Sequence, residues 1–138
     1  MLPISQFAII SVLLTAATIS DIRTREVSDV FSVGILLTAF LNFNIENLIG
    51  LAVPTLCLAI AVLCGGFGGA DVKIIAALSV VMGLEGSVLL VLIALISMLL
   101  FHAFAWIIQK LRKKFAATSY PFVPFIFIGY VCTEILLF

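Results

Sequence analysis

Two acidic residues stand at the edges of apolar stretches, where a charged side chain is costly unless it has a function. Asp21 follows the apolar run of residues 3–20 and belongs to the charged segment SDIRTREVSD, residues 20–29. Asp71 lies in GGFGGADVK, residues 65–73, where four glycines in five positions precede it. Glycines let the backbone bend and let another chain approach closely. The sequence therefore presents two carboxylates beside breaks in apolar runs.

Two carboxyl groups that lie within a few ångströms of each other cannot both ionise cheaply, so such a pair shares a proton. This is the arrangement of an aspartic protease. One carboxylate takes a proton from a water molecule, which then attacks a peptide carbonyl. The other carboxylic acid polarises that carbonyl and afterwards protonates the leaving amine. The reaction requires neither a metal nor a cofactor, and we expect none here.

Each acid also has a simpler explanation from its neighbours in the sequence. Asp21 is close to Arg23 and Arg25 and can belong to an ion pair at the membrane interface. Asp71 can pair with Lys73 in the same way. Asp29 is a typical helix cap. Position alone leaves these explanations open, so the elements that would bring the two aspartates together have to be considered.

The composition indicates a membrane protein. Hydrophobic residues make up 64% of the chain and charged residues 10%, with a mean hydropathy of +1.40. Soluble domains usually carry about 25% charged residues. No basic stripe with interleaved aromatic residues indicates nucleic-acid binding. Cys57, Cys64 and Cys132 lie singly in apolar runs, which predicts neither a zinc site nor a disulfide framework.

The apolar runs predict an all-α, polytopic membrane protein of about six transmembrane helices, in a single domain that covers residues 1–138. The expected spans are residues 3–20, 30–43, 48–64, 70–82, 87–108 and 120–138. We expect Ser28 or Asp29 to cap the second span and Pro54 to kink the third. Residues 83–86 are expected to form a turn between the fourth and fifth spans.

The basic residues predict the orientation in the membrane. All seven lie at the first, third and fifth connections between spans: Arg23, Arg25, Lys73, Lys110, Arg112, Lys113 and Lys114. The second and fourth connections carry only Glu46 and Glu85. By the positive-inside rule, the first, third and fifth connections face the cytoplasm and both termini face outside the plasma membrane. Asp21 and Asp71 then both lie at cytoplasmic ends of their helices, at a similar depth.

Two further polar residues lie inside predicted spans. Glu134 lies near the outer end of the last span, on the wrong side to join the two aspartates. His102, in the fifth span, is expected to hydrogen bond between helices rather than to relay protons.

The two motifs, Asp21 in SDIRTREVSD and Asp71 in GGADVK, resemble those of the prepilin peptidases, polytopic membrane aspartic proteases that process precursors of type IV pilin-like proteins. The tail YPFVPFIFIGY, residues 120–130, is also similar to the last helix of that family. The small size and motif details resemble most the archaeal prepilin and preflagellin peptidases, followed by the small bacterial enzymes for Flp-type pilins. Presenilin-like proteases share a G-x-G-D element but have more spans.

The resemblance implies roles for individual residues. Asp21 and Asp71 would be the two catalytic aspartates, and Gly68 would be the first glycine of the G-x-G-D motif. Gly69, Ala70 and Lys73 would support that motif. Ala70 replaces the second glycine, a departure that points to the archaeal branch.

The resemblance also implies the substrate. Family precursors carry a short basic leader followed by an apolar helix, and the scissile bond would lie at the cytoplasmic membrane face, at the depth of the aspartates. Glu26 and Asp29 are candidates for binding the leader, and lipid headgroups would also attract it. Larger bacterial members carry a cytoplasmic region with paired cysteines that is linked to N-methylation. This chain lacks that region, so we expect cleavage without methylation.

Two other functions compete with a peptidase. A small ion or proton transporter would use acids distributed along a path through the membrane, whereas Asp21 and Asp71 cluster at one face. A non-catalytic partner in membrane assembly would use the glycines of residues 65–69 for close helix packing, but it leaves Asp71 without a role.

Overall fold

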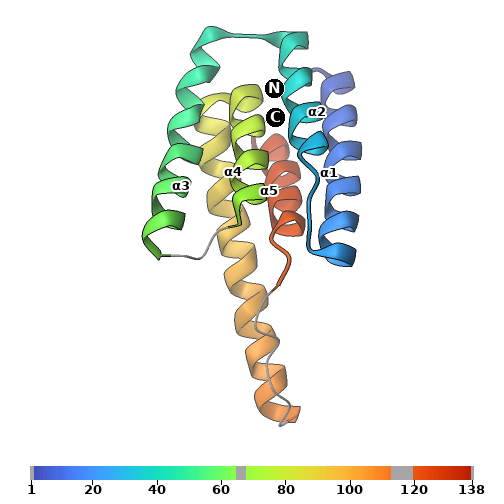
Figure 1. Cartoon of the computed structure of the whole chain (residues 1–138), viewed down its shortest axis with the longest axis vertical. Helices are drawn as coiled ribbons and strands as arrows, with labels where there is room; N and C mark the ends of the chain where they lie inside the picture. The colour runs from blue at the N-terminus through green and yellow to red at the C-terminus, as the bar shows by residue number, and fades with distance from the viewer. Residues whose placement is uncertain (1, 65–67, 113–119, 138) are drawn as a thin grey trace.

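The computed structural model describes residues 2–64, 68–112 and 120–137, which form helices and turns without any strand (Figure 1). This part of the chain confirms the prediction of an all-α protein. The helices, in chain order, are α1 (Ile4–Thr24), α2 (Asp29–Thr38), η1 (Ala39–Asn42), η2 (Ile45–Leu51), α3 (Ala52–Cys64), α4 (Gly69–Arg112) and α5 (Val123–Leu136).

Three helical segments have the length and apolar composition to cross a membrane: Ile4–Thr24, Ile45–Leu63 and Gly69–Leu111. Two apolar helical segments are shorter, Asp29–Asn42 and Val123–Leu136. Large apolar side chains are exposed along all of these segments, from Val12 in α1 to Leu99 in α4. Water would disfavour such a surface, whereas lipid accommodates it.

The turn after α1 is held by side-chain hydroxyl groups. The hydroxyls of Ser20 and Thr24 both donate to the carbonyl oxygen of Glu26, at 2.9 and 3.1 Å. Arg25 adopts a left-handed conformation with a φ of 55°, and its N–H donates to the carbonyl of Asp21. The side chain of Ser28 then accepts a hydrogen bond from the N–H of Val30 and caps α2. Ser28 was one of the two residues predicted for this cap, with Asp29 as the other.

The turn between the fourth and fifth predicted spans is shorter than the expected residues 83–86. Gly83 alone is non-helical, and the helix resumes at the next residue. Gly83 has φ 74° and ψ −170°, a conformation that glycine adopts without a Cβ clash. Asn47 supports the break, since its side-chain amide donates to the carbonyl of Val81 at 3.1 Å. The fourth and fifth predicted spans are thus two helices that meet at Gly83, residues 69–82 and 84–112, and both carry the label α4.

Pro54, the expected site of a kink, lies near the start of α3, directly after the 3-10 helix η2. The N–H of Ala52 donates to the carbonyls of Ile49 and Gly50, so Pro54 lies within the continuous helical segment Ile45–Leu63.

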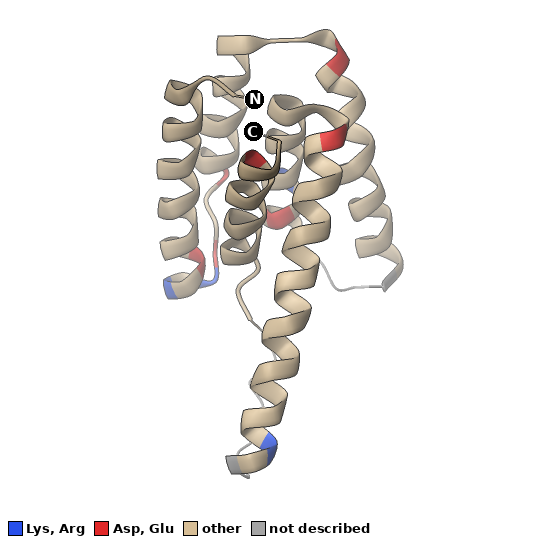
Figure 2. Cartoon of the chain, turned by 180° about the vertical axis from the view of Figure 1, so that it is seen from behind, with Lys and Arg blue, Asp and Glu red and all other residues tan. Residues whose placement is uncertain are grey.

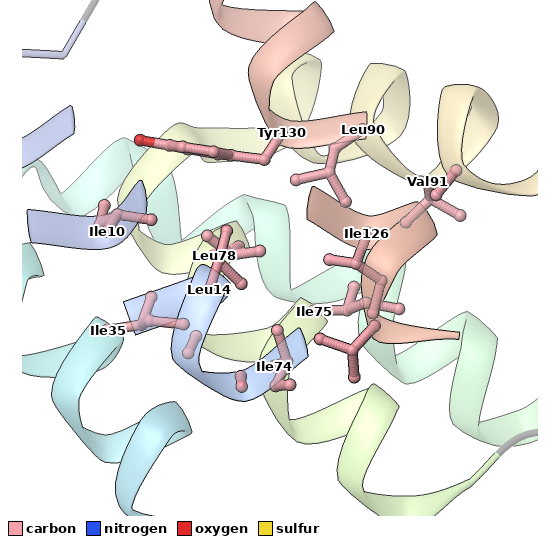
Figure 3. Packing of buried hydrophobic residues seen from close by; sticks show 14 of the residues in the cluster. Ile10, Leu14, Ile35, Ile74, Ile75, Leu78, Leu90, Val91, Ile126 and Tyr130 are labelled. Carbon is pink, nitrogen blue, oxygen red and sulfur yellow. The ribbon is translucent and has the colours of Figure 1, made fainter. Parts of the chain in front are cut away.

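The core lies where α1, α2, α4 and α5 meet. Figure 3 shows Leu14 from α1 beside Leu78 from α4, with Ile126 from α5 close to Ile75. The ring of Tyr130 stacks on Phe7, with centroids 5.6 Å apart. Both parts of α4 contribute to this core, so α4 carries the contacts that hold α2, α3 and α5 in one bundle.

Candidate active site

Asp21 lies in the last turn of α1 and is buried, with 8% of its surface exposed. Its Oδ2 accepts a hydrogen bond from the backbone N–H of Val123 at 3.1 Å. Val123 is the first residue of α5, and its N–H is one of the groups that a helix cannot satisfy internally. The last helix therefore holds one carboxylate oxygen of Asp21 in place.

Asp71 lies in the first turn of α4 and is partly buried. Its backbone N–H donates to the carbonyl of Gly68 at 3.1 Å, so Gly68 begins the helix on which Asp71 is carried. A Cβ on Gly68 would lie 3.0 Å from Oδ2 of Asp71, whereas a Cβ on Gly69 would meet nothing within 4 Å. The glycine at position 68 is thus the one that leaves room for the carboxylate.

The two carboxylates interact electrostatically: the negative charge of Asp21 acts on Asp71. Burial removes water from around both groups, and this strengthens the interaction between them. The carboxylates therefore lie at the same end of the bundle although one belongs to α1 and the other to α4. Such a pair has the components of a proton-sharing dyad.

Lys73 contacts neither aspartate of this pair. Its ammonium nitrogen lies 2.7 and 2.8 Å from the two carboxylate oxygens of Asp29, at the start of α2. More than half of each side chain is exposed to solvent, so the ion pair adds little stability by itself. It joins α2 to the turn of α4 that follows Asp71. The simple pairing of Asp71 with Lys73 that the sequence left open is therefore not formed.

Three other polar residues were singled out in the sequence: Glu26, His102 and Glu134. The side chain of Glu26 is exposed, while its backbone carbonyl accepts the two hydroxyl bonds of the turn after α1. His102 makes an edge-to-face contact with Tyr120, with ring centroids 4.8 Å apart. Glu134 lines a pocket of about 210 Å³ with Asn42 and Asn47, at the other end of the bundle from Asp21.

Two features of this site were not predicted. The bond from the N–H of Val123 to Asp21 involves a backbone group, and only the prolines at 121 and 124 indicate that a helix begins there. The pairing of Asp29 with Lys73 joins two residues that were given separate roles, and no local pattern links them. Among the described residues, no group of three or more His, Cys, Asp and Glu side chains is arranged to hold a metal ion.

Residues 8–103 match the type IV leader peptidase family. This region contains both Asp21 and Asp71 and ends before α5. Comparisons with the curated proteins and with the solved structures find no match. Because this match covers more than half of the sequence, the chain belongs to the type IV leader peptidase family.

Proposed function

We propose that this protein is a membrane-embedded aspartic endopeptidase that removes the basic leader from type IV pilin-like precursors, with Asp21 and Asp71 as its catalytic dyad. The observation that carries the proposal is that Asp21, buried in the last turn of α1, lies near enough for its charge to act on Asp71, partly buried in the first turn of α4. Family membership adds that the reaction is the removal of a leader peptide. Membrane location follows from the apolar helices.

The chemistry needs one proton between the two carboxylates. The ionised carboxylate takes a proton from water as the water oxygen attacks the scissile carbonyl. The protonated carboxyl donates a hydrogen bond to that carbonyl oxygen and later transfers a proton to the leaving amine. The hydrogen bond from the N–H of Val123 to Oδ2 of Asp21 would hold that carboxyl group in one orientation for this exchange of protons.

The proposed orientation places this dyad at the cytoplasmic face of the plasma membrane. The chain would cross the membrane about six times, with both parts of α4 as separate spans and both termini outside. Arg23 and Arg25 follow Asp21 in sequence and Lys73 follows Asp71, which the positive-inside rule assigns to the cytoplasm. The leader of a precursor with an apolar helix would emerge on that side.

The substrate would be a pilin-like or archaellin-like precursor with a basic leader. Glu26 and Asp29 remain the candidates for attracting that leader, and the leader would have to compete with Lys73 for the carboxylate of Asp29. Ala70 in place of the second motif glycine favours the small archaeal branch of the family. We propose cleavage alone, without N-methylation of the product.

The test is a cleavage assay in membranes that compares the wild type with Asp21→Asn and Asp71→Asn. Asparagine keeps the size of the side chain and removes its titration. We expect each variant to lose cleavage of a basic-leader precursor by about 100-fold or more, at normal membrane levels. A variant that retains cleavage would remove its aspartate from the dyad, and activity in the double variant would refute an aspartic mechanism.

A further inference from the structure

The second part of α4 extends well past the other helices. Figures 1 and 2 show its last turns beyond the charged end of α1, and a basic residue lies near the tip. We call residues 101–111 the α4 arm. At the start of the arm, Phe101 packs on Phe125 of α5, with ring centroids 5.5 Å apart. Phe125 follows Val123, which binds Asp21, so the arm begins at the level of the dyad.

The distance by which the α4 arm extends beyond α1 can be estimated by measuring both helices from the same end of the bundle. Leu2, before α1, and Met82, before the second part of α4, line the same pocket at the opposite end of the bundle from the dyad. At 1.5 Å per residue, Arg23 lies about 28 Å along α1 from Ile4. Lys110 lies about 39 Å along α4 from residue 84. The basic end of the arm is therefore about 10 Å farther out than the basic end of α1.

The α4 arm is apolar over most of its circumference. His102 and Gln109 face Tyr120, where Gln109 donates to the Tyr120 hydroxyl at 3.0 Å. Large apolar side chains are exposed along the arm, and that of Leu111 is 79% exposed. They are Phe101, Phe104, Trp106, Ile107, Ile108 and Leu111. A helix with this surface is not stable in water and is accommodated by lipid.

The tip of the arm carries the residues typical of a lipid headgroup region. The ammonium of Lys110 lies 5.0 Å from the ring centre of Trp106, which is 60% exposed. Tryptophan and lysine are both enriched where a membrane helix reaches the headgroups. A basic residue also attracts the anionic lipids of the cytoplasmic leaflet. The surface of the membrane around α4 is thus marked by Trp106 and Lys110.

The helices around the dyad mark a different level. The exposed charged residues Arg23, Asp29 and Lys73 lie at ends of α1, α2 and α4, and hydrocarbon would not tolerate them. The apolar segment Asp29–Asn42, which joins α2 to η1, and α5 each have 14 residues, about 21 Å of α-helix. Both are shorter than a hydrocarbon core of about 30 Å. A short helix is matched when the bilayer thins beside it.

We propose that the α4 arm is embedded in the cytoplasmic leaflet, and that the leaflet thins around α1, α2 and α5 to form a wetted depression over the dyad. Asp21 and Asp71 then lie about 10 Å below the surrounding headgroups, yet in contact with water. Their role as a catalytic pair rests on the proposed function. The depression would supply the hydrolytic water at the depth where an apolar substrate helix ends.

Trp106 is the only tryptophan of the chain, which makes its depth directly measurable. The full chain would be reconstituted in phosphatidylcholine and phosphatidylglycerol vesicles. Its fluorescence would be quenched by lipids brominated near the headgroup or near the end of the acyl chain, and by aqueous acrylamide. Two further variants carry the indole elsewhere in a Trp106→Phe background: Val30→Trp, at the level of the dyad, and Leu92→Trp, in the middle of α4. Both replaced side chains are exposed.

We expect Trp106 to be quenched best by bromine near the headgroup and weakly by acrylamide. The indole at position 92 should be quenched best by bromine deep in the acyl chain. The indole at position 30 should be quenched by acrylamide several-fold more strongly than Trp106, although it lies nearer to the membrane centre. If Val30→Trp does not insert, Val30→Cys with a membrane-impermeant maleimide measures the same access to water.

Three results would overturn the proposal. Strong acrylamide quenching of Trp106 would place the arm in water. Protection of Trp106 from both acrylamide and brominated lipid would mean that protein covers it, either a second copy or another chain. Protection of position 30 from water would mean that the leaflet does not thin. None of these readouts depends on cleavage, so a failure of the peptidase assay would leave them interpretable.

Discussion

Asp21 and Asp71 are supported by different parts of the chain. The α5 backbone binds one oxygen of Asp21, while Asp71 is carried on the first turn of α4 beside Gly68. Because the two residues belong to separate helices, any shift of one helix changes the distance between the carboxylates. If the two carboxylates act as the proposed dyad, the groups that fix each helix end would position them.

Gly68 and Gly69 provide a matched pair of substitutions next to Asp71. In Gly68→Ala the new Cβ would lie 3.0 Å from Oδ2 of Asp71, whereas in Gly69→Ala it would meet nothing within 4 Å. We expect Gly68→Ala to lower kcat by about 10- to 100-fold through displacement of the carboxylate, and Gly69→Ala to lower it much less. If both substitutions lowered kcat equally, Gly68 would not be needed to leave room for the carboxylate of Asp71.

Glu26 is expected to act on substrate binding rather than on the chemical step. Its side chain is exposed close to Asp21 in sequence, and it forms no ion pair among the described residues. Glu26→Lys should raise KM for a precursor with a basic leader several-fold and leave kcat nearly unchanged, with a smaller effect at high salt. Glu26→Gln, which only removes the charge, should give an intermediate KM. A leader without basic residues is the control substrate, and an equal rise in its KM would contradict leader binding.

At the scale of elements, α5 completes the site although the family match ends before it. Val123→Pro removes the N–H that binds Asp21, although Phe122 before it has an αR conformation that a following proline disfavours. We expect kcat to fall about 10- to 100-fold with little change in KM. Val123→Ala keeps the N–H and empties part of the core, so it should lower thermal stability more than kcat.

The control for Val123→Pro is its melting temperature in detergent, which separates loss of the N–H from loss of folding. If Val123→Pro fails to fold, replacement of the Val123 amide by an ester removes the same N–H without the ring. Full activity of a folded protein that lacks this N–H would show that α5 does not position Asp21.

The helices were predictable from the sequence, and their junctions were less so. Apolar runs and the cap at Ser28 predict where helices lie, because burial and capping are local signals. The single-residue break at Gly83 was not predictable in extent, because it depends on Asn47 reaching Val81 from another helix. Asp21 and Asp71 were found as site candidates by their motifs, whereas the bond from Val123 depends on how α5 packs.

At the scale of the whole molecule, the charges are distributed between two ends (Figure 2). Glu46 and Glu134 lie at the end that bears the Asn-lined pocket, and the described basic residues lie toward the other. Asp21 is the one acidic or basic residue with a buried side chain in the described part of the chain. A transporter would need further charged groups between the ends, and the buried interior described here is lined by apolar and neutral polar side chains.

The proposed orientation predicts which positions are reachable from outside the cell. In a background with the cysteines at 57, 64 and 132 replaced by serine, Glu46→Cys should react with a membrane-impermeant maleimide on intact cells. Val30→Cys, at the opposite end of the bundle, should react only after the cells are opened. Both side chains are exposed, so the difference would report sidedness rather than burial. The reverse pattern would place Asp21 and Asp71 outside, where the leader of a precursor does not emerge, and labelling of both positions from outside would contradict a membrane crossing between residues 30 and 46.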